Sequence, residues 1–258
     1  MVMEDLGNGP SLAELLLGPD PDRATSALRA WATTLGTALA ATLRSGAPAE
    51  RTKLTAGLSP LASLAAELAV PVPSGLDDDA AFIEDAFSVA SPWLAYCPGD
   101  TCPDNSRVRA DGSVRLFDFE GSGWRHAASE AAYCRAPLCN CWCMAAVPAG
   151  ILASMEIDFL TGLRPPRPEE FRAAIGLAAV SWTLTTFDYF RSFVVDGRPV
   201  GPPEAPADGR QYVVHRLTAI ESERDRLPAL GDLACRLRKA IVARWPSAAE
   251  LPAYPAFR

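Results

Sequence analysis

The amino-acid sequence predicts a mainly α-helical chain that carries one small β-hairpin near its middle. Apolar residues recur at helical spacing along much of the chain. Asp111-Gly112 joins two short runs of strand-forming residues, which is a strong signal for a hairpin. The composition, with 49% hydrophobic and 21% charged residues, is typical of a globular protein with a substantial core.

The helical segments follow from capping and periodicity. Ser11 with Glu14 forms a capping box that opens a short helix through Leu17. Apolar periodicity and acidic first turns predict the longer helices. These helices are expected at 22–45, 60–69, 79–90, 171–195, 210–226 and 229–244. The aromatic residues within 171–195 are interpreted as core packing, and the Gly/Pro-rich stretch 196–209 as a loop.

The hairpin is expected to bring two oxygen ligands together. Residues 107–110 and 113–117 are the two predicted strands, joined by the two-residue turn Asp111-Gly112. If Ala110 lies opposite Ser113, the same register sets Asn105 opposite Asp118. Directly opposed side chains share one face and lie roughly 5 Å apart at Cβ. The open end of the hairpin therefore predicts a pair of metal ligands.

Asp100 lies on the loop that leads into this hairpin. An Asp followed five positions later by Asn, and then by a strand that ends in Asp-Phe, is typical of an ATP-dependent phosphotransferase site. Asp100 could accept the proton of an attacking hydroxyl, while Asn105 and Asp118 could hold Mg²⁺ against the nucleotide phosphates. The alternative is that all three are ordinary turn residues, chosen for backbone conformation.

These motifs resemble the aminoglycoside phosphotransferase family, which shares the protein-kinase-like fold. The segment Gly99-Asp-Thr-Cys-Pro-Asp-Asn105 is similar to the catalytic loop of that family, and Leu116-Phe-Asp-Phe-Glu120 to its metal-binding segment. The resemblance implies that the chain is the C-terminal lobe of a kinase-like α+β fold. It also implies that Asp100 is the catalytic base, that Asn105 and Asp118 are Mg²⁺ ligands, and that ATP and Mg²⁺ are the cofactors.

The first residues resemble the hinge that holds adenine in this family. Under this interpretation residues 1–10 are a hinge remnant and residues 11–258 form the C-terminal lobe. Within that lobe, 93–120 holds the catalytic loop and metal hairpin, and 121–258 is the helical remainder. Met3, Glu4 and Asp5 would lie along the adenine. The implied function is transfer of the ATP γ-phosphate to a hydroxyl of a small molecule, in the manner of an aminoglycoside-type phosphotransferase.

Three departures from the family pattern affect this expectation. Pro98 stands where the family usually has His, and Glu130 stands where an Asp is expected. The N-terminal lobe is absent, because the sequence supplies neither a Gly-rich loop nor a strand lysine before the hinge. We therefore expect an N-terminally truncated copy with poor activity. The alternative is a non-catalytic kinase-like binding module.

Charge and hydropathy exclude some classes of partner. A net charge of −7 and the lack of a basic stripe argue against nucleic acid. No signal peptide or membrane-spanning segment is apparent, so a cytoplasmic protein without membrane contact is expected. The seven cysteines are then expected to be reduced thiols. The acidic balance suits a small hydroxyl substrate that carries positive charge. Asp188, Glu221, Glu223 and Asp225 could line its pocket, but a solvated surface is the favoured interpretation of these acids.

Two further patterns in the sequence invite other chemistries. The cysteines at 134, 139, 141 and 143 invite a zinc interpretation, but structural zinc usually takes two separated Cys-x2–4-Cys pairs, so buried free thiols are favoured. Ser122 lies near His126 without the G-x-S-x-G pattern of a nucleophile. His126 and His215 are interpreted as polar surface or capping residues.

Overall fold

The computed structural model describes residues 7–48, 53–136 and 141–258, and the helices dominate it. The principal helices are α1 (Leu12–Leu17), α2 (Pro21–Ala40), α3 (Thr55–Glu67), α4 (Leu76–Ser88), α5 (Ala128–Ala131), α6 (Ala149–Leu163), α7 (Pro168–Asp196), α8 (Gly209–Glu221) and α9 (Pro228–Arg244). The helices predicted from the sequence are confirmed with ends shifted by up to five residues. Helices α5 and α6 had no predictions of their own.

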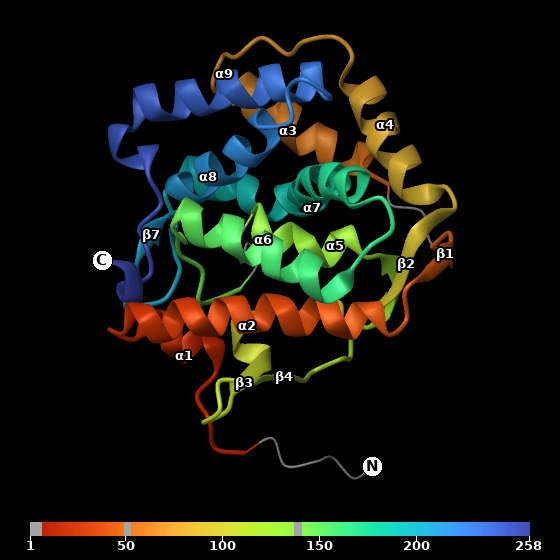
Figure 1. The fold of residues 1–258 in the computed structure, drawn as a ribbon. Helices are drawn as coiled ribbons and strands as arrows, with labels where there is room; N and C mark the ends of the chain where they lie inside the picture. The colour runs from red at the N-terminus through yellow and green to blue at the C-terminus, as the bar shows by residue number, and fades with distance from the viewer. Residues whose placement is uncertain (1–6, 49–52, 137–140) are drawn as a thin grey trace.

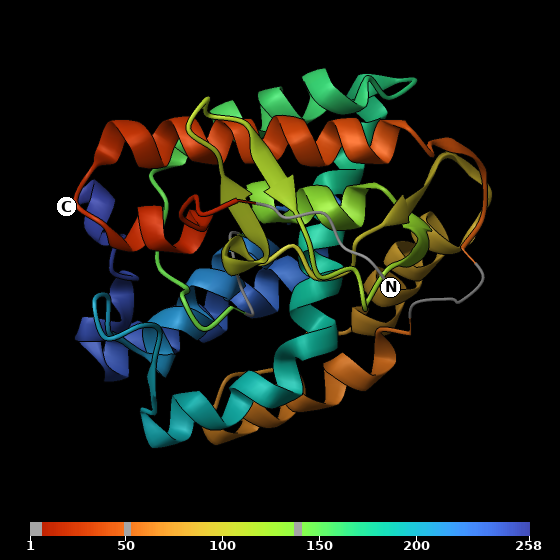
Figure 2. The same cartoon turned by 90° about the horizontal axis from the view of Figure 1, so that it is seen from below.

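The helices stack in layers around one apolar core (Figure 1). Helix α2 lies at one side of the stack and α9 at the other, with α6, α7 and α8 between them. The predicted core role of the α7 aromatics holds for Phe187 and Phe193, which are buried, and Trp182 packs partly buried against the same core. Viewed from below, the hairpin strands lie across α2 (Figure 2).

Helices α2 and α6 pack closely because each presents a glycine to the backbone of the other. A Cβ added to Gly36 would lie 2.2 Å from the carbonyl oxygen of Phe159. A Cβ added to Gly162 would lie 2.4 Å from the carbonyl oxygen of Thr33. Real Cβ atoms do not approach backbone oxygens so closely, so the crossing requires glycine at both positions.

The strands form small antiparallel sheets, and the largest was not predicted. Strand β2 (Ser91–Cys97) pairs with β1 (Arg44–Gly46) on one side and with β5 (Gly123–His126) on the other. A second sheet is the hairpin of β3 (Ser106–Val108) and β4 (Val114–Leu116). The third sheet consists of two strands of two residues each, β6 (Pro199–Val200) and β7 (Ala207–Asp208). Both strands lie inside the segment 196–209, which the sequence predicts as a loop.

The predicted hairpin exists, but its register is shifted by one residue. Ser106 pairs with Leu116 and Val108 with Val114, so Arg109 rather than Ala110 faces Ser113. The turn therefore has three residues, with Gly112 at φ +81°. A type I turn followed by a left-handed glycine is the usual three-residue hairpin loop, whereas the prediction assumed a two-residue turn. Asn105 consequently faces Phe117, and the predicted direct opposition of Asn105 and Asp118 is wrong.

No helix within the described ranges is both long enough and apolar enough to cross a membrane.

The glycine contact between α2 and α6 yields a testable prediction. Gly162→Ala should lower the free energy of unfolding by about 1–3 kcal/mol, because the added methyl group forces two helix backbones apart. Chemical denaturation measures this directly. The matched control is Gly150→Ala in the same helix, where an added Cβ has nothing within 4 Å. That control should be neutral or stabilising by up to about 1 kcal/mol, and equal losses in both variants would contradict the packing argument.

Candidate active site

The candidate site lies where two antiparallel chain segments stop pairing and then resume. Cys97 pairs with Gly123 at the end of the β2–β5 pairing, and Ser106 pairs with Leu116 at the start of the hairpin. Residues 98–105 and residues 117–122 run between these two pairings. The first segment is two residues longer, so it must bulge away from its partner. Asp100 and Asn105 lie on this longer segment, and Asp118 lies on the shorter one.

The two segments touch near Asp100. Gly99 has φ +91°, a left-handed conformation that favours glycine, and a Cβ added to it would lie 2.1 Å from the carbonyl oxygen of Gly121. At the other end of the interruption the Phe117 N–H donates to the carbonyl oxygen of Asn105 at 3.1 Å. Contacts at both ends thus hold the loop of Asp100 alongside the segment of Asp118.

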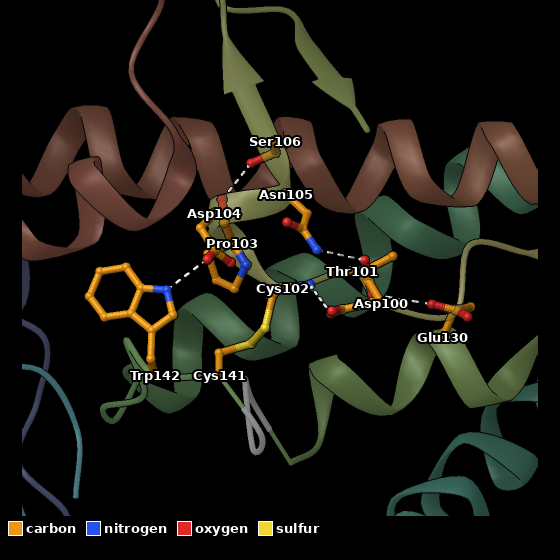
Figure 3. Close-up of a disulfide and its surroundings, with 10 residues drawn as sticks. All are labelled: Asp100, Thr101, Cys102, Pro103, Asp104, Asn105, Ser106, Glu130, Cys141 and Trp142. Atoms are coloured by element: carbon orange, nitrogen blue, oxygen red, sulfur yellow. Dashed lines mark hydrogen bonds between the residues drawn. A yellow bond between two sulfur atoms is a disulfide. The ribbon is translucent and has the colours of Figure 1, made fainter. Parts of the chain in front are cut away.

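Local hydrogen bonds connect Asp100 to Asn105 within the loop (Figure 3). The Cys102 N–H donates to Asp100 Oδ1 at 3.2 Å, which orients the carboxylate. Asn105 Nδ2 donates to the backbone carbonyl oxygen of Asp100 at 3.2 Å, and the Asn105 N–H donates to the Cys102 carbonyl oxygen at 2.9 Å. Two of the three predicted site residues are therefore brought together by the loop itself.

Asp118 holds a rare backbone conformation. Its φ is +62°, in the left-handed region that non-glycine residues seldom adopt, although Asp tolerates it better than most. Such strained residues occur preferentially at functional sites. The side chains of Asp100 and Asp118 are both exposed, and Asn105 is half-buried. The predicted adenine contacts Met3, Glu4 and Asp5 lie outside the described residues.

Glu130 is a residue of the candidate site whose contacts the sequence did not reveal. Its carboxylate is buried beneath the loop, where Oε1 accepts a hydrogen bond from the Gly99 N–H at 3.1 Å and Oε2 from the Thr101 hydroxyl at 3.2 Å. These bonds anchor both neighbours of Asp100. Burial raises the pKa of Glu130, and the two hydrogen bonds oppose that rise. The nearest sequence signal was its place after the metal segment, where an Asp was expected.

A cavity of about 320 Å³ lies behind the loop. Gly99, Arg125 and Glu130 line one side of it, and residues of α7, including Trp182, line the other. Of the acids proposed for a cationic substrate, Glu221 pairs with Arg238 and Glu223 with Arg226. Asp188 and Asp225 are exposed. The paired acids therefore give little support to a cationic pocket.

The cysteines differ from the expectation of reduced thiols. Cys102 and Cys141 form a disulfide, with their Cα atoms 5.8 Å apart. Within the described residues Cys97, Cys134, Cys143 and Cys235 are free and buried, and Cys139 lies outside them. No group of three or more His, Cys, Asp or Glu side chains in that part of the chain is arranged to hold a metal ion. The favoured reading of the cluster, buried free thiols, therefore holds for Cys134 and Cys143 but is wrong for Cys141.

His126 is not a surface residue. Its ring is buried among Phe87, Trp93 and Phe171, and Nδ1 accepts a hydrogen bond from the Ala128 N–H at 3.2 Å. The expected surface position is therefore wrong, whereas a capping role at the start of α5 fits. Burial lowers the pKa of His126 to about 4 and, together with Arg216, that of His215 also to about 4. Both rings are neutral at pH 7.

No protein-family model matches the chain, and no curated protein matches it.

Glu130→Ala should lower the free energy of unfolding by about 2–4 kcal/mol, because the Gly99 N–H and the Thr101 hydroxyl both lose a buried partner. Glu130→Gln keeps an acceptor oxygen and should lose less. Urea denaturation compares the variants, with Glu120→Ala as the control because Glu120 is exposed in the neighbouring segment. If Glu130→Ala were as stable as Glu120→Ala, Glu130 would not be the anchor of the loop.

The neutral histidines make stability depend on pH. Since the folded-state pKa of His126 is about 4 and the unfolded value about 6.5, its contribution is complete above pH 6.5 and is lost as the pH falls towards 4. The loss amounts to about 3 kcal/mol for His126. His126→Phe should therefore flatten the curve of unfolding free energy against pH over this interval. A curve parallel to the wild-type curve would show that His126 carries no such shift.

Proposed function

We propose that this chain carries the phosphoryl-transfer site of an ATP-dependent, aminoglycoside-type small-molecule phosphotransferase. The observation that supports it is the interruption between the two strand pairings. There an exposed Asp100, tied to Asn105 by a hydrogen bond, stands beside the segment of Asp118. Phosphoryl transfer demands chiefly positioning and charge stabilisation, and this arrangement offers a base and oxygen ligands on adjoining backbones.

Asp100 is assigned as the residue that orients and deprotonates the substrate hydroxyl. Its Oδ1 accepts the Cys102 N–H, so the carboxylate has a fixed direction at an exposed position. The side-chain amide nitrogen of Asn105 donates its hydrogen bond to the backbone carbonyl oxygen of Asp100. This leaves Asn105 Oδ1 for a cation.

Asn105 Oδ1 and the Asp118 carboxylate are hard oxygen ligands of the kind that Mg²⁺ prefers. When bound, the ion would neutralise charge on the phosphates. One carboxylate and one amide provide few ligands, which suits an ion that keeps its waters and takes further ligands from the nucleotide.

The second candidate is a non-catalytic kinase-like module that binds Mg²⁺·ATP without transferring phosphate. The proposed location is the cytoplasm, where ATP is available.

Mg²⁺·ATP should raise the melting temperature of the chain by a few degrees, because a ligand that binds only the native state stabilises it. Asp118→Asn should abolish the rise without lowering the basal melting temperature, since Asn tolerates the left-handed backbone as Asp does. Differential scanning fluorimetry with and without millimolar Mg²⁺·ATP measures both effects. Asp225→Asn, a change at an exposed aspartate of another element, is the control.

Asp100→Asn separates the catalytic from the binding proposal. It should keep the Mg²⁺·ATP shift while removing residual transfer of phosphate from radiolabelled ATP to hydroxyl compounds. No shift for the wild-type chain would contradict both candidates. Rapid transfer by the wild-type chain would contradict the expected slow turnover.

A further inference from the structure

The disulfide Cys102–Cys141 joins the candidate catalytic loop to a segment distant in sequence (Figure 3). Cys102 lies between Asp100 and Asn105. Cys141 is 39 residues further along the chain and precedes Trp142, whose Nε1 donates to Asp104 Oδ2 at 2.6 Å. A covalent bond and a hydrogen bond therefore link the same two segments side by side.

Cys102 is the residue through which this link acts on the site. Its backbone N–H orients the Asp100 carboxylate, and its backbone carbonyl oxygen accepts the Asn105 N–H. Fixing the position of Cys102 therefore fixes the groups on both sides of it. Release of its side chain frees the residue that holds Asp100 and Asn105 in one arrangement.

The surroundings determine how the disulfide can be opened. Cys141 is buried with Cys143 against Ala13 of α1, whereas Cys102 is only partly buried at the edge of this cluster. Of the two cysteines, Cys102 is therefore the more accessible to a reagent from solution. Burial raises the pKa of Cys143 to about 12, so this neighbour is a thiol rather than a thiolate. An external thiol, not Cys143, must start the exchange.

We propose that Cys102 and Cys141 are a reversible redox pair that fixes the Asp100–Asn105 loop when oxidised and releases it when reduced. A regulatory role for this pair rests on the proposed function, because the loop that it fixes is the proposed catalytic loop. Disulfides in a reducing compartment are usually transient and redox-sensing, which fits a bond placed in the loop rather than in the core.

The reaction balances with a low-molecular-weight thiol such as glutathione. One thiolate attacks the Cys102 sulfur, forms a mixed disulfide and releases the Cys141 thiolate, which takes a proton. A second thiolate attacks the mixed disulfide. The small molecule leaves as its own disulfide, and both cysteines are reduced. Formation of the bond is the reverse, with glutathione disulfide as the oxidant.

The first test detects the bond itself. The full chain is incubated with glutathione disulfide, denatured, labelled with an alkylating reagent and analysed by mass spectrometry before and after reduction. Two more cysteines should react with the alkylating reagent in the reduced sample than in the unreduced sample. Cys102→Ala and Cys141→Ala should each reduce this difference to at most one cysteine, namely the remaining cysteine held as a mixed disulfide with glutathione. Cys143→Ala, in the same buried cluster, should keep the difference of two. No difference in the wild-type chain, or near-stoichiometric zinc released by thiol modification, would overturn the proposal.

The second test measures the loop. Hydrogen exchange at the amides of Cys102 and Asn105 should become roughly five- to tenfold faster on reduction, as expected when a hydrogen bond loses its support. The Cys143→Ala chain should respond as the wild type does. Unchanged exchange after reduction would overturn the proposal. Neither readout needs ATP, so a missing Mg²⁺·ATP shift would contradict the proposed function alone.

Discussion

The antiparallel pairing of residues 94–108 with residues 114–126 is the constraint on which the candidate site depends. This ribbon is continuous except where residues 98–105 face residues 117–122, and it resumes in the hairpin with the longer side bulged. The bulge presents Asp100 and Asn105, and the shorter side presents Asp118. Because both ends are fixed by ladder hydrogen bonds, the residues between them are held within this interruption.

The strained backbone conformation of Asp118 is compatible with the contacts that fix the chain on either side of it. A left-handed non-glycine residue costs about 1–3 kcal/mol and persists only where the surroundings enforce it. On one side the Phe117 N–H is held by Asn105, and on the other the Ser122 N–H closes a turn onto the Phe119 carbonyl oxygen. Both flanks are therefore set, and Asp118 must bridge them. An exposed carboxylate on such a fixed backbone would be preorganised for the cation that the proposed phosphoryl-transfer site requires.

The sequence could predict the helices and the presence of the hairpin, because both follow from local signals. Capping at Ser11 and apolar periodicity depend on neighbouring residues, as does the turn signal of Asp111-Gly112. The register could not be predicted, since two-residue and three-residue loops both accept Asp-Gly and only the Arg109–Ser113 hydrogen bond decides between them. The pairing of β2 with β5, the anchoring by Glu130 and the cysteine pairing join residues 25 or more positions apart, and spacing alone does not reveal such partners.

The ties that hold the loop are concentrated on the longer side of the ribbon, where two residues have no counterpart across the interruption. Glu130 holds Gly99 and Thr101, Trp142 holds Asp104, and the disulfide holds Cys102. A disulfide that closes a loop of 39 residues lowers the entropy of the unfolded chain. At 25 °C this destabilises the unfolded state by about 4 kcal/mol. The hydrogen bonds to Glu130 are buried, whereas the disulfide includes the partly buried Cys102. In the proposed redox pair, reduction would act on the residue between Asp100 and Asn105, which lies beside the small Cys141–Cys143 cluster and outside the main apolar core.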